Sequence, residues 1–315
     1  MKILILFLAL VVGTANAFPT KPVRIIVAFP PGGGTDIVSR LLAPRLTDLW
    51  GQAVVVENRA GASGTIGTEI AARADPDGHT LFMATMGNMT ANQHLYPKMA
   101  VDPLRALAPI TKVVDVHFVF VANPALPAAS VKELIELARK RPGEIPYSSS
   151  GPGGAPHLAM ELFKRQAGVD LTHVPYKGSG PGMNDLLGGR VMVTMDSLLQ
   201  SLPQIKAGRL KALAVLGPKR SALLPDVPTV AEAGVPGYAL TNWFGLLVPA
   251  ATPKEVVSKL NKDVLQVLTD AEIKKKIADM GADVVGNSAE EFGAAMRAES
   301  AQWAEVIKSA NIKAE

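Results

Sequence analysis

The most constraining feature of this sequence is a strand, glycine-rich turn and helix pattern that occurs twice. The apolar run Val23 to Phe29 leads into a turn at residues 30–34, and apolar residues then recur from Asp36 to Leu49 at the spacing of one helix face. Later, Ile145 to Ser149 leads into a second such turn at residues 151–154, followed again by helical spacing. Strands that alternate with helices favour parallel pairing, so each pattern predicts a layered α/β unit.

The remaining segments extend both units. Short apolar runs predict further strands at Val54 to Glu57, Thr80 to Thr85, Val116 to Ala122, His173 to Tyr176, Val191 to Met195, Leu210 to Leu216 and Trp243 to Val248. Capping signals predict helix starts at Ser130, at Thr252-Pro253 and at Ser288, each with Glu three residues after the cap. The helix-rich C-terminal part must pack on another element, and we expect it to pack on the first unit.

A chain of 315 residues has room for two lobes of ordinary domain size. We expect the chain to leave the first lobe along Val116 to Ala122 and to return near Trp243 to Val248. The predicted lobes are therefore a discontinuous lobe 1, residues 18–120 plus 245–315, and lobe 2, residues 121–244.

The N-terminal segment is typical of a secretory signal peptide. Lys2 precedes the apolar run Ile3 to Val12, and Ala15-Asn16-Ala17 is a small-x-small cleavage site, so we expect residues 1–17 to be removed. A retained membrane anchor is the alternative, which the cleavage site disfavours. No other stretch approaches the roughly 18 apolar residues of a spanning helix, so a soluble, exported protein is expected.

Composition excludes several classes of function. The absence of cysteine excludes disulfides, thiolate metal sites and catalytic thiols. The formal net charge of +4 becomes +3 without Lys2 (4 − 1 = 3), and the basic residues are spread along the chain without interleaved aromatic residues. We therefore expect no nucleic-acid binding.

The two glycine-rich turns are candidate anion sites. Glycine lets the backbone approach a ligand closely, and the start of a helix offers unpaired N–H groups at the positive end of its dipole. Two such helix starts across a cleft could hold a carboxylate without a buried arginine. Taken singly, each turn is as well explained as a helix-capping loop, with Thr35 or Asp36 capping the first helix.

Four further polar positions stand near predicted strand ends or helix starts. Asn88 and Thr90 follow the strand Thr80 to Thr85, and Asp196 follows Val191 to Met195. Open α/β sheets place ligands at such strand ends. Asp196 could accept from an amino or hydroxyl group, although a helix-capping role fits it slightly better, and His157 lies in the first turn after the second glycine-rich turn.

Known catalytic motifs are absent. The sequence has no phosphate-binding P-loop, no complete dinucleotide-binding glycine fingerprint and no Gly-x-Ser-x-Gly nucleophile turn. The histidines have no metal-ligand spacing. We expect neither an enzyme nor a bound metal or cofactor.

Several motifs together resemble the tripartite tricarboxylate transporter substrate-binding proteins, also called Bug-type receptors. They run through nearly all of the expected mature chain in the family's order: KPVRIIVAFPPGGGTD (21–36), GQ (51–52), VVVENR (54–59), GASG (61–64), DPDGHTL (75–81), VPYKGSGP (174–181), PTVAEAG (228–234) and PAATP (249–253). Two departures are seen: Asn92-Gln93-His94-Leu95-Tyr96 replaces the family's Asn-Pro before Leu-Tyr, and the segment at Pro109 lacks a Phe. Both departures concern the lobe 1 rim.

The resemblance implies a type II periplasmic-binding-protein fold, α/β in both lobes, that closes on a small organic carboxylate between the lobes. It also implies a periplasmic location, a monomer, and transient contact with the large and small membrane subunits of a transporter. Service to a sensor kinase and a periplasmic enzyme on the same scaffold are the alternatives. The ligand contacts implied by position are Gly32, Gly33, Gly34, Thr35, Asp36, Asn88, Thr90, Ser149, Ser150, Gly151, Gly153, Gly154, Ala155, His157, Tyr176 and Asp196.

Overall fold

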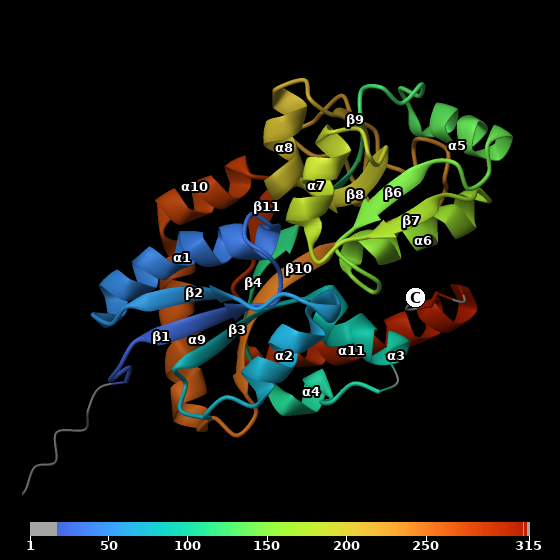
Figure 1. The fold of residues 1–315 in the computed structure, drawn as a ribbon. Coiled ribbons are helices and arrows are strands. Elements are labelled where there is room, and N and C mark those ends of the chain that lie inside the picture. The colour runs from blue at the N-terminus through green and yellow to red at the C-terminus, as the bar shows by residue number, and fades with distance from the viewer. Residues whose placement is uncertain (1–17, 97, 311, 314–315) are drawn as a thin grey trace, which may run out of the picture.

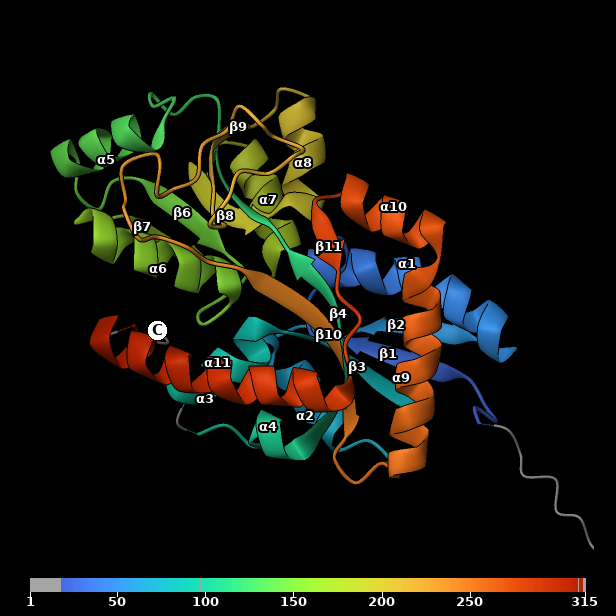
Figure 2. The ribbon, with the colours of Figure 1, turned by 180° about the vertical axis from the view of Figure 1, so that it is seen from behind.

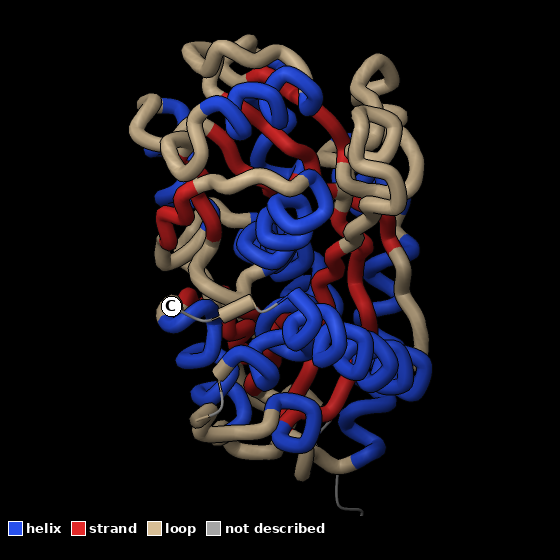
Figure 3. The backbone as a smooth tube through the Cα atoms, turned by 90° about the vertical axis from the view of Figure 1, so that its right-hand side faces the viewer, coloured by secondary structure: helices blue, strands red, loops and turns tan. Residues whose placement is uncertain are grey.

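The chain forms two α/β lobes, each built on its own sheet (Figure 1). The computed structural model describes residues 18–96, 98–310 and 312–313, so the expected signal segment 1–17 lies outside the described residues. In the side view of Figure 3 one lobe lies above the other.

Lobe 1 is built on a six-stranded sheet with the order β11-β4-β10-β3-β1-β2. Its strands are β1 (Val23–Val27), β2 (Val54–Asn58), β3 (Thr80–Thr85), β4 (Leu107–Val116), β10 (Asn242–Pro249) and β11 (Ala282–Val284). β1 pairs in parallel with β2 and β3, as predicted, but β10 is antiparallel to both β3 and β4. The parallel pairing expected for strands that alternate with helices therefore holds for β1, β2 and β3, whereas the other three pairings of this sheet, including that of β11 with β4, are antiparallel.

Helices cover the lobe 1 sheet. They are α1 (Gly34–Trp50), α2 (Thr65–Ala72), α3 (Asn92–Leu95), α4 (Pro103–Ala106), α9 (Lys254–Thr269), α10 (Ala271–Asp279) and α11 (Ala289–Ala310), with the short turns η1 (Ala62–Gly64) and η2 (Gly87–Ala91). α9 and α11 both pack on β4, and α9 also contacts α1 (Figure 2). The prediction that the C-terminal helices pack on the first unit is confirmed.

Lobe 2 has a five-stranded sheet with the order β7-β6-β8-β5-β9. Its elements are β5 (Phe118–Ala122), α5 (Val131–Lys140), β6 (Pro146–Ser149), α6 (Ala155–Ala167), β7 (Thr172–Pro175), α7 (Ser179–Leu187), β8 (Val193–Ser197), α8 (Leu198–Lys206) and β9 (Lys211–Val215). β6 is parallel to β7 and β8, whereas β5 is antiparallel to β8 and β9.

The chain crosses between the lobes at two adjacent places. β4 ends at Val116, and β5 begins in the other sheet at Phe118, so the predicted single strand Val116 to Ala122 is divided at His117. On the way back, Asn242 opens β10 directly opposite Val116. The expected boundaries at 120/121 and 244/245 thus lie inside β5 and β10, whereas the sheets change at His117 and before Asn242.

Helices begin at all three predicted starts, but only two of the three predicted side-chain caps are present. Ser130 Oγ accepts the N–H of Glu133, and Ser288 Oγ accepts the N–H of Glu291, so both form side-chain caps. Thr252 does not cap α9, because Pro253 occupies the cap position and the buried Thr252 hydroxyl has no partner. Within the described ranges, no helix has the length and apolar character that crossing a bilayer would require.

Candidate ligand-binding site between the lobes

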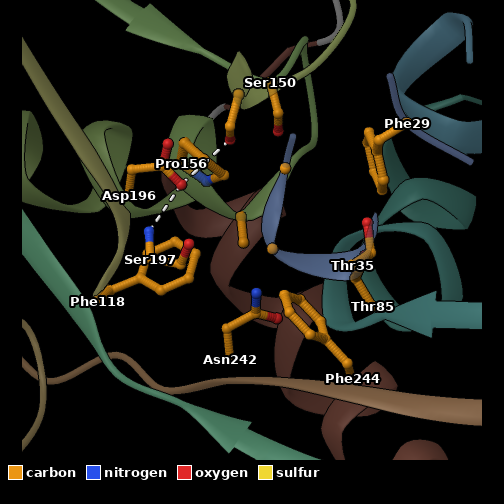
Figure 4. Close-up of a pocket in the computed structure, with 14 residues that line it drawn as sticks. Phe29, Thr35, Thr85, Phe118, Ser150, Pro156, Asp196, Ser197, Asn242 and Phe244 are labelled. Carbon is orange, nitrogen blue, oxygen red and sulfur yellow. Dashed lines mark hydrogen bonds between the residues drawn. The ribbon is translucent and has the colours of Figure 1, made fainter. Parts of the chain in front are cut away.

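A cavity of about 40 Å³ lies between the lobes (Figure 4). It is lined by Phe29, Gly33, Gly34, Thr35, Thr85, Phe118, Ser150, Ala155, Pro156, Ser179, Asp196, Ser197, Asn242 and Phe244. Residues of both glycine-rich turns therefore border one space. A water molecule needs at least about 10–15 Å³ of such volume, so this space has room for a few waters or for one polar group of a larger ligand.

The first turn presents an uncapped helix start to this cavity. Gly33 is the cap residue of α1 and no side chain caps the helix, so neither Thr35 nor Asp36 does so. At Gly34 a Cβ would lie 2.9 Å from Cζ of Phe244 and 3.3 Å from Oγ of Ser197. Glycine is therefore required at Gly34 for the turn to approach the floor of the cavity and lobe 2.

Asp36 stabilises the first turn through hydrogen bonds to its carboxylate. Its carboxylate accepts the N–H of Gly32 at 3.0 Å, Nε of Arg40 at 3.0 Å and Nδ2 of Asn58 at 3.0 Å. Burial alone would raise the pKa of Asp36, but these hydrogen bonds from Arg40, Gly32 and Asn58 outweigh it and hold the pKa below its ordinary value. Gly32 and Asp36 lie outside the cavity lining.

The second turn has a similar design. Gly154 is the cap residue of α6, again without a side-chain cap. Ser149 Oγ accepts the N–H of Gly151 at 3.0 Å and lies 2.6 Å from Nε2 of His173. Ser149 therefore stabilises the turn without lining the cavity. Ser150 and Ala155 border the cavity.

His157 also supports the second turn and does not line the cavity. Its Nδ1 accepts the N–H of Gly153 at 3.1 Å. The imidazole must be neutral to accept this bond, and burial lowers the pKa of His157 to about 4.

Gly151, Gly153 and Gly154 face protein atoms. A Cβ on Gly151 would lie 2.5 Å from Oγ of Ser63, and one on Gly153 would lie 2.4 Å from Oδ1 of Asn92. A Cβ on Gly154 would meet Ser150 Oγ of its own turn. None of the three lines the cavity, so Gly151 and Gly153 permit contact with lobe 1.

Asp196 lies at the end of β8 and borders the cavity. Its Oδ1 accepts the N–H of Ser197 at 2.7 Å and the hydroxyl of Ser179 at 3.1 Å (Figure 4). Burial raises the pKa of Asp196 to about 6, and these two hydrogen bonds offset only part of that shift. The alternative that Asp196 caps a helix is wrong, because Ser197 occupies the cap position of α8.

Two buried polar atoms of the lining have no hydrogen-bond partner in the protein. They are Oγ of Ser197 and Oδ1 of Asn242. An unsatisfied buried polar atom costs about 1–3 kcal/mol, so the site is suited to a polar ligand or bridging water. Among the described residues that line the cavity, none is Lys or Arg.

The other three predicted residues lie away from the cavity. Asn88, in the π-type turn η2, accepts the N–H of Thr85 at 2.9 Å. The hydroxyl of Thr90 lies 2.8 Å from Met86 O and 2.9 Å from Oε2 of Glu299. The hydroxyl of Tyr176 donates to Oδ2 of Asp185 at 2.7 Å within lobe 2.

Sequence reasoning missed eight lining residues. They are Phe29, Thr85, Phe118, Pro156, Ser179, Ser197, Asn242 and Phe244. Thr85 ends a predicted strand, and Ser197 ends β8 two residues beyond the predicted strand Val191 to Met195, so strand ends could have indicated both. Phe118 and Phe244 belong to apolar strands, where an aromatic side chain is normally read as core.

A second, larger space lies behind the crossover. We call it the rear groove: about 740 Å³, bordered by lobe 1 residues such as Trp243 and Asp283 and by residues 217–223 of lobe 2. Side chains alternate along β10, so Asn242 and Phe244 border the cavity while Trp243 borders the groove. The cavity and the rear groove are therefore on opposite faces of the crossover.

Comparison with known proteins identifies relatives along almost the whole chain. The sequence model described as "Tripartite tricarboxylate transporter family receptor" matches residues 38–312. Protein BugT of Bordetella pertussis is 36% identical over 301 residues, which are 95% of this chain and 92% of BugT.

Solved structures share the fold. The periplasmic binding protein BugD has a TM-score of 0.90 and 39% identity, covering 94% of this chain and 99% of BugD. R. palustris Rpa4515 with adipate has a TM-score of 0.91 and 40% identity, with 94% and 99% covered. MatC (Rpa3494) from Rhodopseudomonas palustris with bound malate has a TM-score of 0.88 and 30% identity, with 92% and 100% covered.

Proposed function

The chain belongs to the tripartite tricarboxylate transporter receptor family, and we propose that it captures a small organic carboxylate between its lobes. Members of this family and the solved neighbours are periplasmic solute-binding proteins, and two of the neighbours hold adipate and malate. We propose a periplasmic location, delivery of the ligand to the membrane subunits of a transporter, and no chemical turnover of the ligand.

The observation that carries this proposal is the pair of uncapped helix starts that border one cavity. The N-termini of α1 and α6 border the same space from opposite lobes, and no side chain caps either helix. Backbone N–H groups at a helix start bind anions well. A carboxylate held in this way requires no cationic side chain, which agrees with the lining.

The two unpartnered polar atoms of the lining can bind the part of the ligand that the helix starts do not contact. Ser197 Oγ can donate to a carboxylate oxygen, and Asn242 Oδ1 can accept from a hydroxyl, an amino group or a bridging water. Asp196 also borders this space, so an anion beside it favours a proton shared between the two acids. The proposed ligand is thus a small acid with a second polar group.

The ligand class is tested by thermal unfolding in the presence of single acids. Malate, succinate, adipate, citrate, aspartate, glutamate and benzoate are added to the purified protein, and hits are confirmed by calorimetric titration. A ligand that binds only the folded state raises the melting temperature, so at least one acid is expected to do so. Failure of the whole panel to shift the transition contradicts the proposal.

Two serine variants test the site. Ser197→Ala removes the unpartnered hydroxyl of the cavity, and we expect affinity for the best acid to fall roughly tenfold. Ser201→Ala is the matched control, because its hydroxyl is equally buried and unpartnered, one helical turn further along and outside the cavity lining. Equal affinities of the two variants would contradict the placement of the ligand.

A further inference from the structure

Tyr96 connects the two lobes at the second glycine-rich turn. It follows α3 of lobe 1, and its hydroxyl donates to the carbonyl of Pro152 at 2.7 Å, in the loop between β6 and α6 of lobe 2. Figure 1 shows this loop reaching from lobe 2 towards α3. Burial raises the pKa of Tyr96, which keeps the hydroxyl protonated and able to donate.

The loop residues on either side of Pro152 are glycines that leave room for lobe 1. Gly151 and Gly153 have φ of 116° and 81°, and a Cβ on either would come within 2.5 Å of Ser63 or Asn92. The lobe 1 partner is fixed in turn: Nδ2 of Asn92 donates to the carbonyl of Ser63 at 2.9 Å. These two glycines therefore serve contact between lobes.

Ser63 has an unusual backbone conformation. Its φ is 52°, and the preceding Ala62 has a φ of 45°. The left-handed region disfavours residues with a Cβ by about 1–2 kcal/mol each, and such conformations concentrate at functional positions. Here the conformation places Ser63 against Gly151 of the other lobe.

We propose that Tyr96, Ser63 and Asn92, together with residues 151–153, form a clasp that holds the lobes closed over the cavity. Tyr96 is a positioning residue, because it acts on lobe closure and does not line the cavity. The clasp rests on the proposed function in one respect only, which is that closure retains a ligand. It also gives a role to Tyr96, the last residue of the altered segment of lobe 1.

At the first glycine-rich turn the lobes meet by packing. A Cβ on Gly178 of lobe 2 would lie 2.4 Å from Cδ of Pro30 in lobe 1. The clasp instead includes a directional hydrogen bond between the lobes, which stabilises one closed geometry. A typical intramolecular hydrogen bond changes an equilibrium roughly two- to tenfold.

The lobe distance provides a test that requires no ligand. The chain has no cysteine, so Gln302→Cys on α11 and Glu136→Cys on α5 supply two exposed nitroxide sites, one per lobe. Electron double resonance then measures the populations of closed and open distances. In this background Tyr96→Phe is expected to lower the ratio of closed to open molecules roughly two- to tenfold.

The matched control is Tyr238→Phe. This tyrosine also donates to a backbone carbonyl, that of Ala159 at 2.9 Å, but both partners belong to lobe 2. Its loss should lower the free energy of unfolding and leave the distance distribution unchanged. Identical closed fractions in wild type and Tyr96→Phe, or an equal change in Tyr238→Phe, overturn the proposal.

Two glycine variants distinguish the effect of contact between the lobes from the effect of backbone strain. Gly153→Ala adds a methyl group beside Asn92. Gly237 has a φ of 78°, close to the 81° of Gly153, but a methyl group added there by Gly237→Ala would meet open space. Only Gly153→Ala is expected to favour the open distance. If both variants open the lobes equally, backbone strain explains the effect and the clasp is rejected.

Malate is the probe for the liganded state. The dissociation rate of malate, measured by stopped flow, should rise roughly two- to tenfold in Tyr96→Phe, with little change in the association rate. If no acid of the panel binds, the proposed ligand class fails, while the distances of the unliganded protein still decide whether the clasp exists.

Discussion

The imidazole Nδ1 of His157 accepts the backbone N–H of Gly153, with 3.1 Å between the two nitrogens. This bond fixes the neutral imidazole with its proton on Nε2. It also ties the apex of the second glycine-rich turn to the first turn of α6, so the shape of the loop depends on a titratable group that the cavity does not contact.

The protein should lose stability as the pH falls through the range in which His157 titrates. The folded pKa of about 4 lies below the unfolded value of 6.5, so between these values the unfolded chain binds more protons. The stabilisation is fully present above pH 6.5 and falls by about 2–3 kcal/mol towards pH 4. Urea unfolding between pH 4 and 7.5 measures this slope. His157→Asn keeps an acceptor near Gly153 and should flatten it; an unchanged slope would contradict the assignment.

Replacing Asp196 by Asn should stabilise the protein at neutral pH. Burial raises the folded pKa of Asp196 to about 6 from 3.8, so ionisation above that pH opposes folding. Asn keeps the oxygen that accepts from Ser197 and Ser179. We expect a gain of about 1–3 kcal/mol in the free energy of unfolding at pH 8 and no difference near pH 3.5. Equal stability of both proteins at pH 8 would be inconsistent with a buried, ionised carboxylate.

Asp36→Ala should cost about 2–4 kcal/mol, because it leaves the N–H of Gly32 and the amide of Asn58 without their acceptor. Glu69→Ala is the matched control: Glu69 forms an ion pair with Arg73 at the same i,i+4 spacing as Asp36 with Arg40, but both partners are exposed. The control should lose less than about 0.5 kcal/mol. Chemical denaturation compares them, and losses of equal size would refute the structural role of Asp36.

Removing the hydroxyl of Thr252, before α9, and that of Ser288, before α11, should have different effects on the stability of the protein. Ser288→Ala removes a side-chain cap and is expected to cost about 1 kcal/mol. Thr252→Val removes a buried hydroxyl without a partner and should be neutral or stabilising. Thermal unfolding of both variants tests this, and destabilisation by Thr252→Val would show that its hydroxyl has a bonding role.

The sequence predicted elements best where local pattern and burial agree. Thr80 to Thr85 is an all-buried strand found with the predicted bounds, and the two glycine-rich turns do meet at one cavity. The division at His117 could not be predicted, because apolar residues continue on both sides of it and the change of sheet depends on tertiary pairing. β4 was missed because its polar residues interrupt the apolar pattern of an interior strand.

The roles of individual site residues were harder to predict. A glycine can admit a ligand, a neighbouring lobe or a positive φ, and the sequence alone does not distinguish these. Gly34 approaches the cavity floor, whereas Gly151 and Gly153 approach lobe 1. Similarly, Asp36 and His157 stand in the expected turns, but their side chains point to backbone N–H groups of those turns.

The adjacency of the two crossings has a mechanical consequence. Val116 and Asn242 are register partners, so both connections between the lobes leave from neighbouring points of one hydrogen-bonded strand pair. Such a joint acts as a hinge with a single axis. The cavity and the rear groove lie on its two faces, so a rotation of the lobes about this axis that widens the cavity narrows the rear groove beside Trp243.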